Sequence, residues 1–143
     1  MQTSQNRINL IKQFEGLRLE AYQCAAGVWT IGYGHTSGVK QGDKITLAQA
    51  EDFLRSDLEK FENAINNLVK AELNQNQFDA LVSFVFNIGI NAFKQSTMLK
   101  FINNNSFPLA AGQFDRWIKS NGKVLEGLVK RRKAEKELFL KAD

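Results

Sequence analysis

Residues 14–36, FEGLRLEAYQCAAGVWTIGYGHT, bring a carboxyl group, a thiol and a hydroxyl group into one short stretch, on Glu15, Cys24 and Thr30. The same stretch holds the only cysteine and the only histidine of the chain. A carboxyl group beside apolar surface favours its protonated form, which a general acid requires. A thiol or a hydroxyl group can hold or activate a nucleophile. The combination therefore suggests acid-assisted chemistry on a substrate that reaches this segment.

Glu15 stands at the expected end of a short helix over residues 5–14. Ile8, Ile11 and Phe14 recur at helical spacing, and Gly16 follows the carboxylate. A carboxylate at this position meets the negative end of the helix dipole, which favours its neutral form. A solvated surface glutamate is the alternative interpretation.

Residues 22–36 change in character and predict a small antiparallel ribbon, because strand-forming residues alternate with turn-forming glycines. Strict alternation would place Trp29, Ile31, Tyr33 and His35 on a bulky face and Val28, Thr30, Gly32 and Gly34 on a small one. Two glycines on one face would let a ligand approach the backbone closely. Relief of strand twist is the alternative role for these glycines.

Two further residues of this segment have structural alternatives. A lone cysteine such as Cys24 is usually an inert core residue, although its small-residue neighbours in QCAAG favour exposure. His35 is expected to be a packing residue that pairs with a carboxylate, and Asp57 is the candidate.

The rest of the chain is mainly helical. Thr46 and Gln49 form a capping box at the start of one long helix over about 46–70, which would connect two lobes. A second helix, from Asn74 or Asn76 to about Ile88, is apolar nearly all round and should be the buried core helix. Shorter helices are expected at about 95–103, 107–118 and 124–140. The fold class is therefore α+β, with a small β lobe and a larger helical lobe.

Arg132 interrupts the apolar face of the last helix, on which Leu125, Leu128 and Phe139 also lie. A buried guanidinium group needs a carboxylate partner, and Glu15 is the partner that we expect. Extension of the side chain to water is the alternative.

Composition limits the classes of function. The length of 143 residues suits one domain, and the net charge of +4 favours an anionic partner such as a polysaccharide or a lipid surface. One cysteine and one histidine cannot supply a four-ligand zinc site, so no metal is expected. We expect no secretory signal, no transmembrane segment in the apolar stretch 80–90, and no nucleic-acid partner.

The spacing Glu15–x8–Cys24–x5–Thr30, followed by TIGYGH at 30–35, resembles the phage-type lysozyme family, glycoside hydrolase family 24. The similarity continues through NQNQFDALVSFVFNIG (74–89) and GLVKRRKAEKELF (127–139), and so covers nearly the whole chain. The resemblance implies a single lysozyme-like domain, with a β lobe at about 15–45, a connecting helix at about 46–70, and a helical lobe at about 71–143 that includes the N-terminal helix.

The resemblance also implies a function. The family's muramidases cleave the β-1,4 bond between N-acetylmuramic acid and N-acetylglucosamine in peptidoglycan, without a cofactor. Glu15 would be the general acid, and Thr30 would hold the attacking water. Gly34, Phe86 and Asn87 match positions that line the substrate cleft. An endolysin of this kind, expected as a monomer, would be made in the host cytoplasm and would reach the cell wall in the periplasm after holin-type release.

Cys24 departs from the two-carboxylate rule of glycosidases, because it occupies a place that aspartate often fills in the family. A free thiol is only slightly ionised at neutral pH, and a neighbouring Glu15 anion would reduce that fraction further. Cys24 could position water together with Thr30, its thiolate could attack the sugar directly, or Glu20 could supply the missing carboxylate. We favour the first of these roles.

Other functions remain open at this point. A lytic transglycosylase would use an internal muramic hydroxyl group in place of water. A cysteine hydrolase would use Cys24 with His35 as base, although strand alternation turns His35 away from Thr30. The basic C-terminal helix could bind or disturb an anionic outer-membrane surface, although a core helix with a solvated basic face is the more common meaning of such a pattern.

Overall fold

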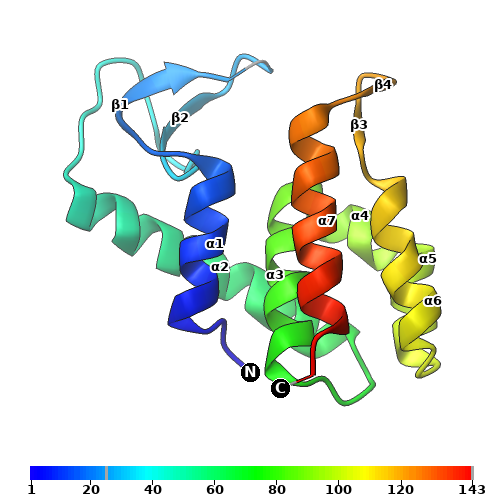
Figure 1. The fold of residues 1–143 in the computed structure, drawn as a ribbon. Helices are drawn as coiled ribbons and strands as arrows, with labels where there is room; N and C mark the ends of the chain where they lie inside the picture. The colour runs from blue at the N-terminus through cyan, green and yellow to red at the C-terminus, as the bar shows by residue number, and fades with distance from the viewer. Residues whose placement is uncertain (25, 143) are drawn as a thin grey trace. The chain divides into compact units, whose positions relative to one another are not determined.

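The computed structural model describes residues 1–24 and 26–142, which form seven α-helices, one 3₁₀ helix and two small antiparallel sheets (Figure 1). The chain divides into two compact units. We call Gln5–Lys60 the β unit, and Met1–Ser4 with Phe61–Asp143 the helical unit. The mixture of helices with small antiparallel sheets confirms the α+β class.

The β unit contains α1 (Gln5–Glu15), β1 (Arg18–Gln23) and β2 (Trp29–Gly32). The helix ends at Glu15 because Gly16 adopts a φ of +71° and donates its N–H to the Lys12 carbonyl at 2.9 Å. The two strands pair antiparallel, with Tyr22 opposite Thr30. The ribbon is thus confirmed, although its first strand begins four residues earlier than predicted, at Arg18 instead of residue 22.

Helix α1 was expected in the helical lobe, but the structure groups it with the β unit. Lys12 accounts for part of this placement. Its ammonium group lies 2.6 Å from the Glu51 carboxylate on α2 and 5.6 Å from the centre of the Tyr33 ring. The pKa of Glu51 is lowered by its hydrogen bond and charge interaction with Lys12. The salt bridge therefore ties α1 to the first half of α2.

Helix α2 (Leu47–Leu68) is the predicted long helix. Thr46 accepts a hydrogen bond from the Gln49 N–H at 3.2 Å, and the Gln49 side chain accepts one from the Thr46 N–H at 2.8 Å. These two bonds are the predicted capping box. The boundary between the units falls within this helix, after Lys60, so α2 is the element that joins the two lobes.

The core of the helical unit is built around α3 (Gln75–Ile88), as its apolar sequence predicts. Nine of its residues are buried, and it packs against α7 (Glu126–Leu140), which is the predicted C-terminal helix (Figure 1). Phe84 and Phe114 meet edge to face with their ring centroids 5.0 Å apart, and Phe114 meets Phe139 in the same manner at 5.6 Å.

The segment between α3 and α7 differs from the prediction in two places. The predicted helix at 95–103 is α5 (Thr97–Asn103), which Ser96 caps, and the short helix before it, α4 (Ile90–Lys94), was not predicted. The predicted helix at 107–118 is α6 (Phe107–Gly112) with a 3₁₀ turn, η1 (Gln113–Arg116).

A hairpin follows that was not predicted. It consists of β3 (Lys119–Ser120) and β4 (Lys123–Val124). Asn121 and Gly122 form its turn with φ values of +52° and +79°, as a two-residue hairpin turn requires.

The first four residues are fastened to the helical unit by polar contacts. The Met1 ammonium group donates to Asn66 at 3.1 Å, and the Ser4 hydroxyl group donates to the buried Asp79 carboxylate at 2.8 Å. Gln75 donates to the Gln2 carbonyl at 2.9 Å, and the adjacent Asn76 donates to the Lys141 carbonyl at 3.3 Å. Both ends of the chain therefore meet at the first turn of α3.

The cap of α3 gives the first testable prediction. Asn74 Oδ1 accepts the Gln77 N–H at 2.7 Å, so Asn74→Ala should lower the free energy of unfolding by about 1 kcal/mol, as loss of a helix cap does. Urea denaturation followed by circular dichroism measures this change. Ser106→Ala is the control, because Ser106 begins α6 without a side-chain cap bond. An equal loss in both variants would contradict the prediction.

Candidate active site

The carboxylate of Glu15 lies against a backbone position that has no side chain. Glu15 is the last residue of α1 and is half-buried. A Cβ atom placed on Gly34 would come within 3.2 Å of Glu15 Oε1, and Gly34 has a φ of +84°. A larger residue at position 34 would therefore be strained and would push the carboxylate away. Gly34 is thus a neighbour of the candidate acid.

Gly32 has a different role from the one that strand alternation predicted. A Cβ atom on Gly32 would contact Ala50 and Ile45 at 3.4 Å, so this glycine allows close packing on α2. The strand ends here, because Gly32 has a φ of +67°, and the turn that follows returns His35 to pair with Ile31. The predicted alternation from Trp29 to His35 in one strand is therefore wrong beyond Gly32.

Cys24 and Thr30 are brought together next to the ribbon. The single hydroxyl proton of Thr30 has two acceptors beside it, the Val28 carbonyl oxygen, 3.0 Å from Oγ1, and the Cys24 sulfur, whose pKa the Thr30 side chain lowers. Thr30 is buried, whereas Cys24 is partly exposed. A thiol and a hydroxyl group thus adjoin each other in the same unit as Glu15.

The ionisation of Cys24 differs from the expectation for an ordinary thiol beside an anion. Its pKa is lowered, mainly by a hydrogen bond from the Val28 backbone N–H, with smaller contributions from the Ala26 N–H and the Thr30 hydroxyl group. Such donors stabilise the thiolate, because they bond more strongly to the charged form. The shift is therefore opposite in direction to the one expected from a neighbouring anion.

His35 makes the contact that the sequence predicted. Its Nδ1 lies 2.8 Å from Asp57 Oδ2 on α2, and its ring stacks on Phe53 with the centroids 4.2 Å apart. Its backbone exchanges two hydrogen bonds of 2.9 Å with Ile31. These contacts fix the turn that contains Gly34, which is consistent with a supporting role.

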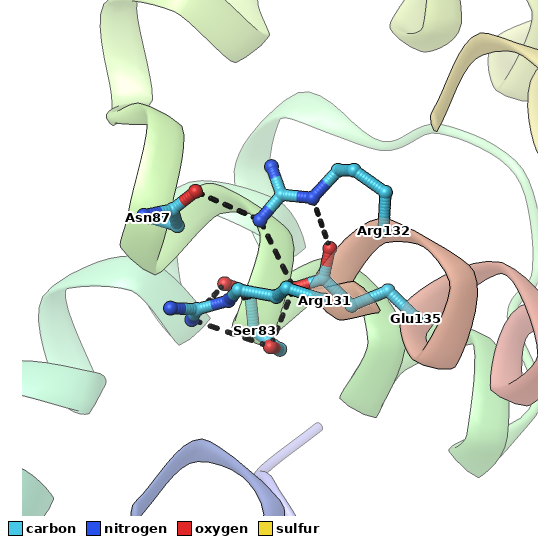
Figure 2. A network of polar contacts seen from close by, with 5 residues as sticks. All are labelled: Ser83, Asn87, Arg131, Arg132 and Glu135. Atoms are coloured by element: carbon cyan, nitrogen blue, oxygen red, sulfur yellow. Dashed lines mark hydrogen bonds and ion pairs between the residues drawn. The ribbon is translucent and has the colours of Figure 1, made fainter. Parts of the chain in front are cut away.

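The remaining predicted residues lie in the helical unit. Arg132 is buried, as its position on an apolar face predicted, and it does not extend to water. Its Nε lies 2.8 Å from Glu135 Oε1, and its Nη2 donates to Asn87 Oδ1 at 2.8 Å (Figure 2). Glu135 is thus a carboxylate partner of Arg132, and the pairing with Glu15 stays a prediction. Phe86 is half-buried and meets Phe61 edge to face at 5.2 Å.

Several supporting residues were missed by the sequence analysis. Glu135 and Ser83 join Arg132 in one polar cluster, and the signal for Glu135 was available, because it lies three residues after Arg132 on the same helix. The Val28 N–H leaves no signal in the sequence, since every residue except proline carries a backbone donor.

Comparisons with known proteins identify the family of the chain. The Phage lysozyme family matches residues 12–135, so the chain belongs to the phage lysozyme family. It is 51% identical to an endolysin of Acyrthosiphon pisum secondary endosymbiont phage 1, and the match covers 97% of this chain and 98% of that protein.

Two other relatives differ in length or origin. The endolysin of Bacillus phage PZA is 51% identical over 97% of this chain, which spans only 55% of that protein. The solved muramidase domain of SpmX from Asticaccaulis excentricus superposes with a TM-score of 0.93 at 48% identity, over 99% of both chains.

Among the described residues, no helix has the length and apolar character that crossing a membrane requires.

The lowered pKa of Cys24 gives the second testable prediction. The rate of alkylation by iodoacetamide follows the thiolate fraction, so its pH midpoint should be lower in the folded protein than in the urea-unfolded chain. Thr30→Val removes one of the donors and should move the midpoint of the folded protein upward. A folded protein with the midpoint of the unfolded chain would contradict the assignment.

Proposed function

We propose that this protein is a peptidoglycan-degrading endolysin, a lysozyme that hydrolyses the β-1,4 bond between N-acetylmuramic acid and N-acetylglucosamine. Membership of the phage lysozyme family supports the reaction class. The observation that carries the residue roles is the hydrogen-bonded pair of Cys24 and Thr30 in the same unit as Glu15.

Glu15 is the general acid of this proposal. Its carboxyl group donates a proton to the bridging glycosidic oxygen as the bond to the anomeric carbon breaks. The approach of Gly34 leaves one side of the carboxylate without a side chain, which suits contact with a sugar.

Thr30 and Cys24 hold the attacking water. The single hydroxyl proton of Thr30 is donated to the Val28 carbonyl or to the Cys24 sulfur, and in either case the lone pairs of Oγ1 can accept a hydrogen bond from water. The Cys24 sulfur accepts a second hydrogen bond from the water, and its lowered pKa favours the thiolate form, which takes the proton that the water loses. The water oxygen then forms its bond to the anomeric carbon.

The other predicted residues bind the glycan or support the site. Gly34, Phe86 and Asn87 contact the sugars, and His35, Asp57 and Arg132 hold the surrounding structure.

The proposal also covers the oligomeric state of the enzyme, its location and its attraction to a membrane surface. The enzyme acts as a monomer on peptidoglycan strands in the periplasm, after synthesis in the host cytoplasm and holin-type release. The exposed Lys130 and Lys133 of α7 can also attract an anionic outer-membrane surface. The helix buries Leu138 and Phe139 in the core, so this attraction is electrostatic.

Replacement of the acid is the third testable prediction. Glu15→Gln keeps the shape and removes the proton, so kcat on purified cell walls should fall by about two to four orders of magnitude. Glu20→Gln is the matched control, because Glu20 is an exposed glutamate of β1 and should retain activity. Near-full activity of Glu15→Gln would refute the acid assignment, and killing of cells by this variant would reveal an effect on membranes without catalysis.

Substitution of the thiol is the fourth testable prediction. Cys24→Asp should retain activity, because a carboxylate can also hold water and accept its proton. Cys24→Ser should retain part of it, whereas complete loss in both variants would favour a thiolate nucleophile. Mass spectrometry of the products distinguishes hydrolysis, which leaves a reducing end, from transglycosylation, which leaves an anhydro-sugar.

A further inference from the structure

A cluster of buried charged groups in the helical unit has no part in the proposed reaction steps. It consists of Ser83 and Asn87 on α3 and of Arg131, Arg132 and Glu135 on α7 (Figure 2). Glu135 is 0% exposed and Arg132 is 1% exposed, whereas Asn87 is exposed. Buried ion pairs are costly to desolvate and are often no more stabilising than apolar residues of the same volume. Their presence here therefore invites an explanation beyond stability.

Glu135 is the centre of this cluster. Its Oε1 lies 2.8 Å from Arg132 Nε, and its Oε2 accepts hydrogen bonds from Ser83 Oγ at 2.6 Å and from Arg131 Nε at 3.2 Å. Burial raises the pKa of the Glu135 carboxyl group, and the two guanidinium groups oppose that shift. The contacts from three directions leave the carboxylate little freedom, so it holds Arg132 in one orientation.

Arg132 transmits this order to the surface. Its Nη2 donates to Asn87 Oδ1 at 2.8 Å. A guanidinium group carries only donors, so it selects the oxygen of the Asn87 amide and turns the NH₂ group away. A free asparagine could present either end of its amide to a ligand, whereas Asn87 held in this manner presents donors.

We propose that Glu135 is a positioning residue, which fixes Arg132 so that the Asn87 amide presents its NH₂ group to an acceptor oxygen of the glycan. The carbonyl oxygen of an N-acetyl group, which both sugars carry, is such an acceptor. The inference rests on the proposed function, because it takes Asn87 as a glycan contact. Glu135 acts through another residue and does not touch the substrate.

Steady-state kinetics on soluble oligosaccharides of alternating N-acetylglucosamine and N-acetylmuramic acid test this proposal. Asn87→Ala should raise KM by about three- to tenfold, which is the worth of one hydrogen bond, and should leave kcat within about twofold. Glu135→Gln should raise KM similarly. In the Asn87→Ala background, Glu135→Gln should have no further effect on KM, because the residue through which it acts is absent.

Asp79→Asn is the matched control. Asp79 is also a buried carboxylate of the helical unit, and it accepts hydrogen bonds from Ser4 and Gln75. This variant should lose stability without a change in KM. An equal rise of KM in Asp79→Asn and Glu135→Gln, an unchanged KM in Glu135→Gln, or additive effects of Glu135→Gln and Asn87→Ala would each overturn the proposal.

Asn87→Asp keeps the proposal testable if Glu135→Gln does not fold. The exposed aspartate has the shape of asparagine but offers only acceptors, so KM should rise at least as much as in Asn87→Ala. An unchanged KM would overturn the inference. Cleavage by the wild-type protein and its loss in Glu15→Gln, measured in the same assay, test the proposed function separately. If the wild-type protein cleaves the substrate but KM is unchanged in the variants, only the role of Glu135 is refuted.

Discussion

The end of helix α1 is the constraint on which the proposed chemistry depends. Gly16 stops the helix directly after Glu15, and Gly34 offers a backbone surface against which the carboxylate can lie. Gly16 thus places Glu15 at the end of the helix, and Gly34 provides the backbone that its carboxylate contacts. The contacts of Lys12 with α2 and of His35 with Asp57 hold these two glycines in the same unit.

In the proposed site, the thiol of Cys24 takes the place of a carboxylate, and hydrogen-bond donors lower its pKa. Backbone N–H groups at Val28 and Ala26 and the hydroxyl group of Thr30 all favour the ionised sulfur. Such dipoles belong to the turn itself, so they are already in place before a ligand binds and need no reorganisation. A small ribbon can therefore supply the electrostatics that a second acidic residue provides in most glycosidases.

Much of the fold followed from local rules. The capping box at Thr46 marked the start of α2, and an apolar sequence identified α3 as the core helix. The pairing of His35 with Asp57 was also predictable, because a half-buried imidazole ring needs a polar partner. The turn after Gly32 was not, since alternation describes a strand but does not say where the strand ends. A partner for Arg132 was sought only far away in the sequence, although helix geometry also offered Glu135 one turn along.

The meeting of both chain ends at α3 has a consequence for the order of the sequence. Gln75 and Asn76 are neighbours, and they hold the carbonyl groups of Gln2 and Lys141. A short linker could thus join the ends, and a new opening between Ser4 and Gln5 would make each of the two units continuous along the chain. In such a circular permutant the first four residues would be synthesised last. It would therefore test whether their contacts stabilise the fold independently of the order of synthesis.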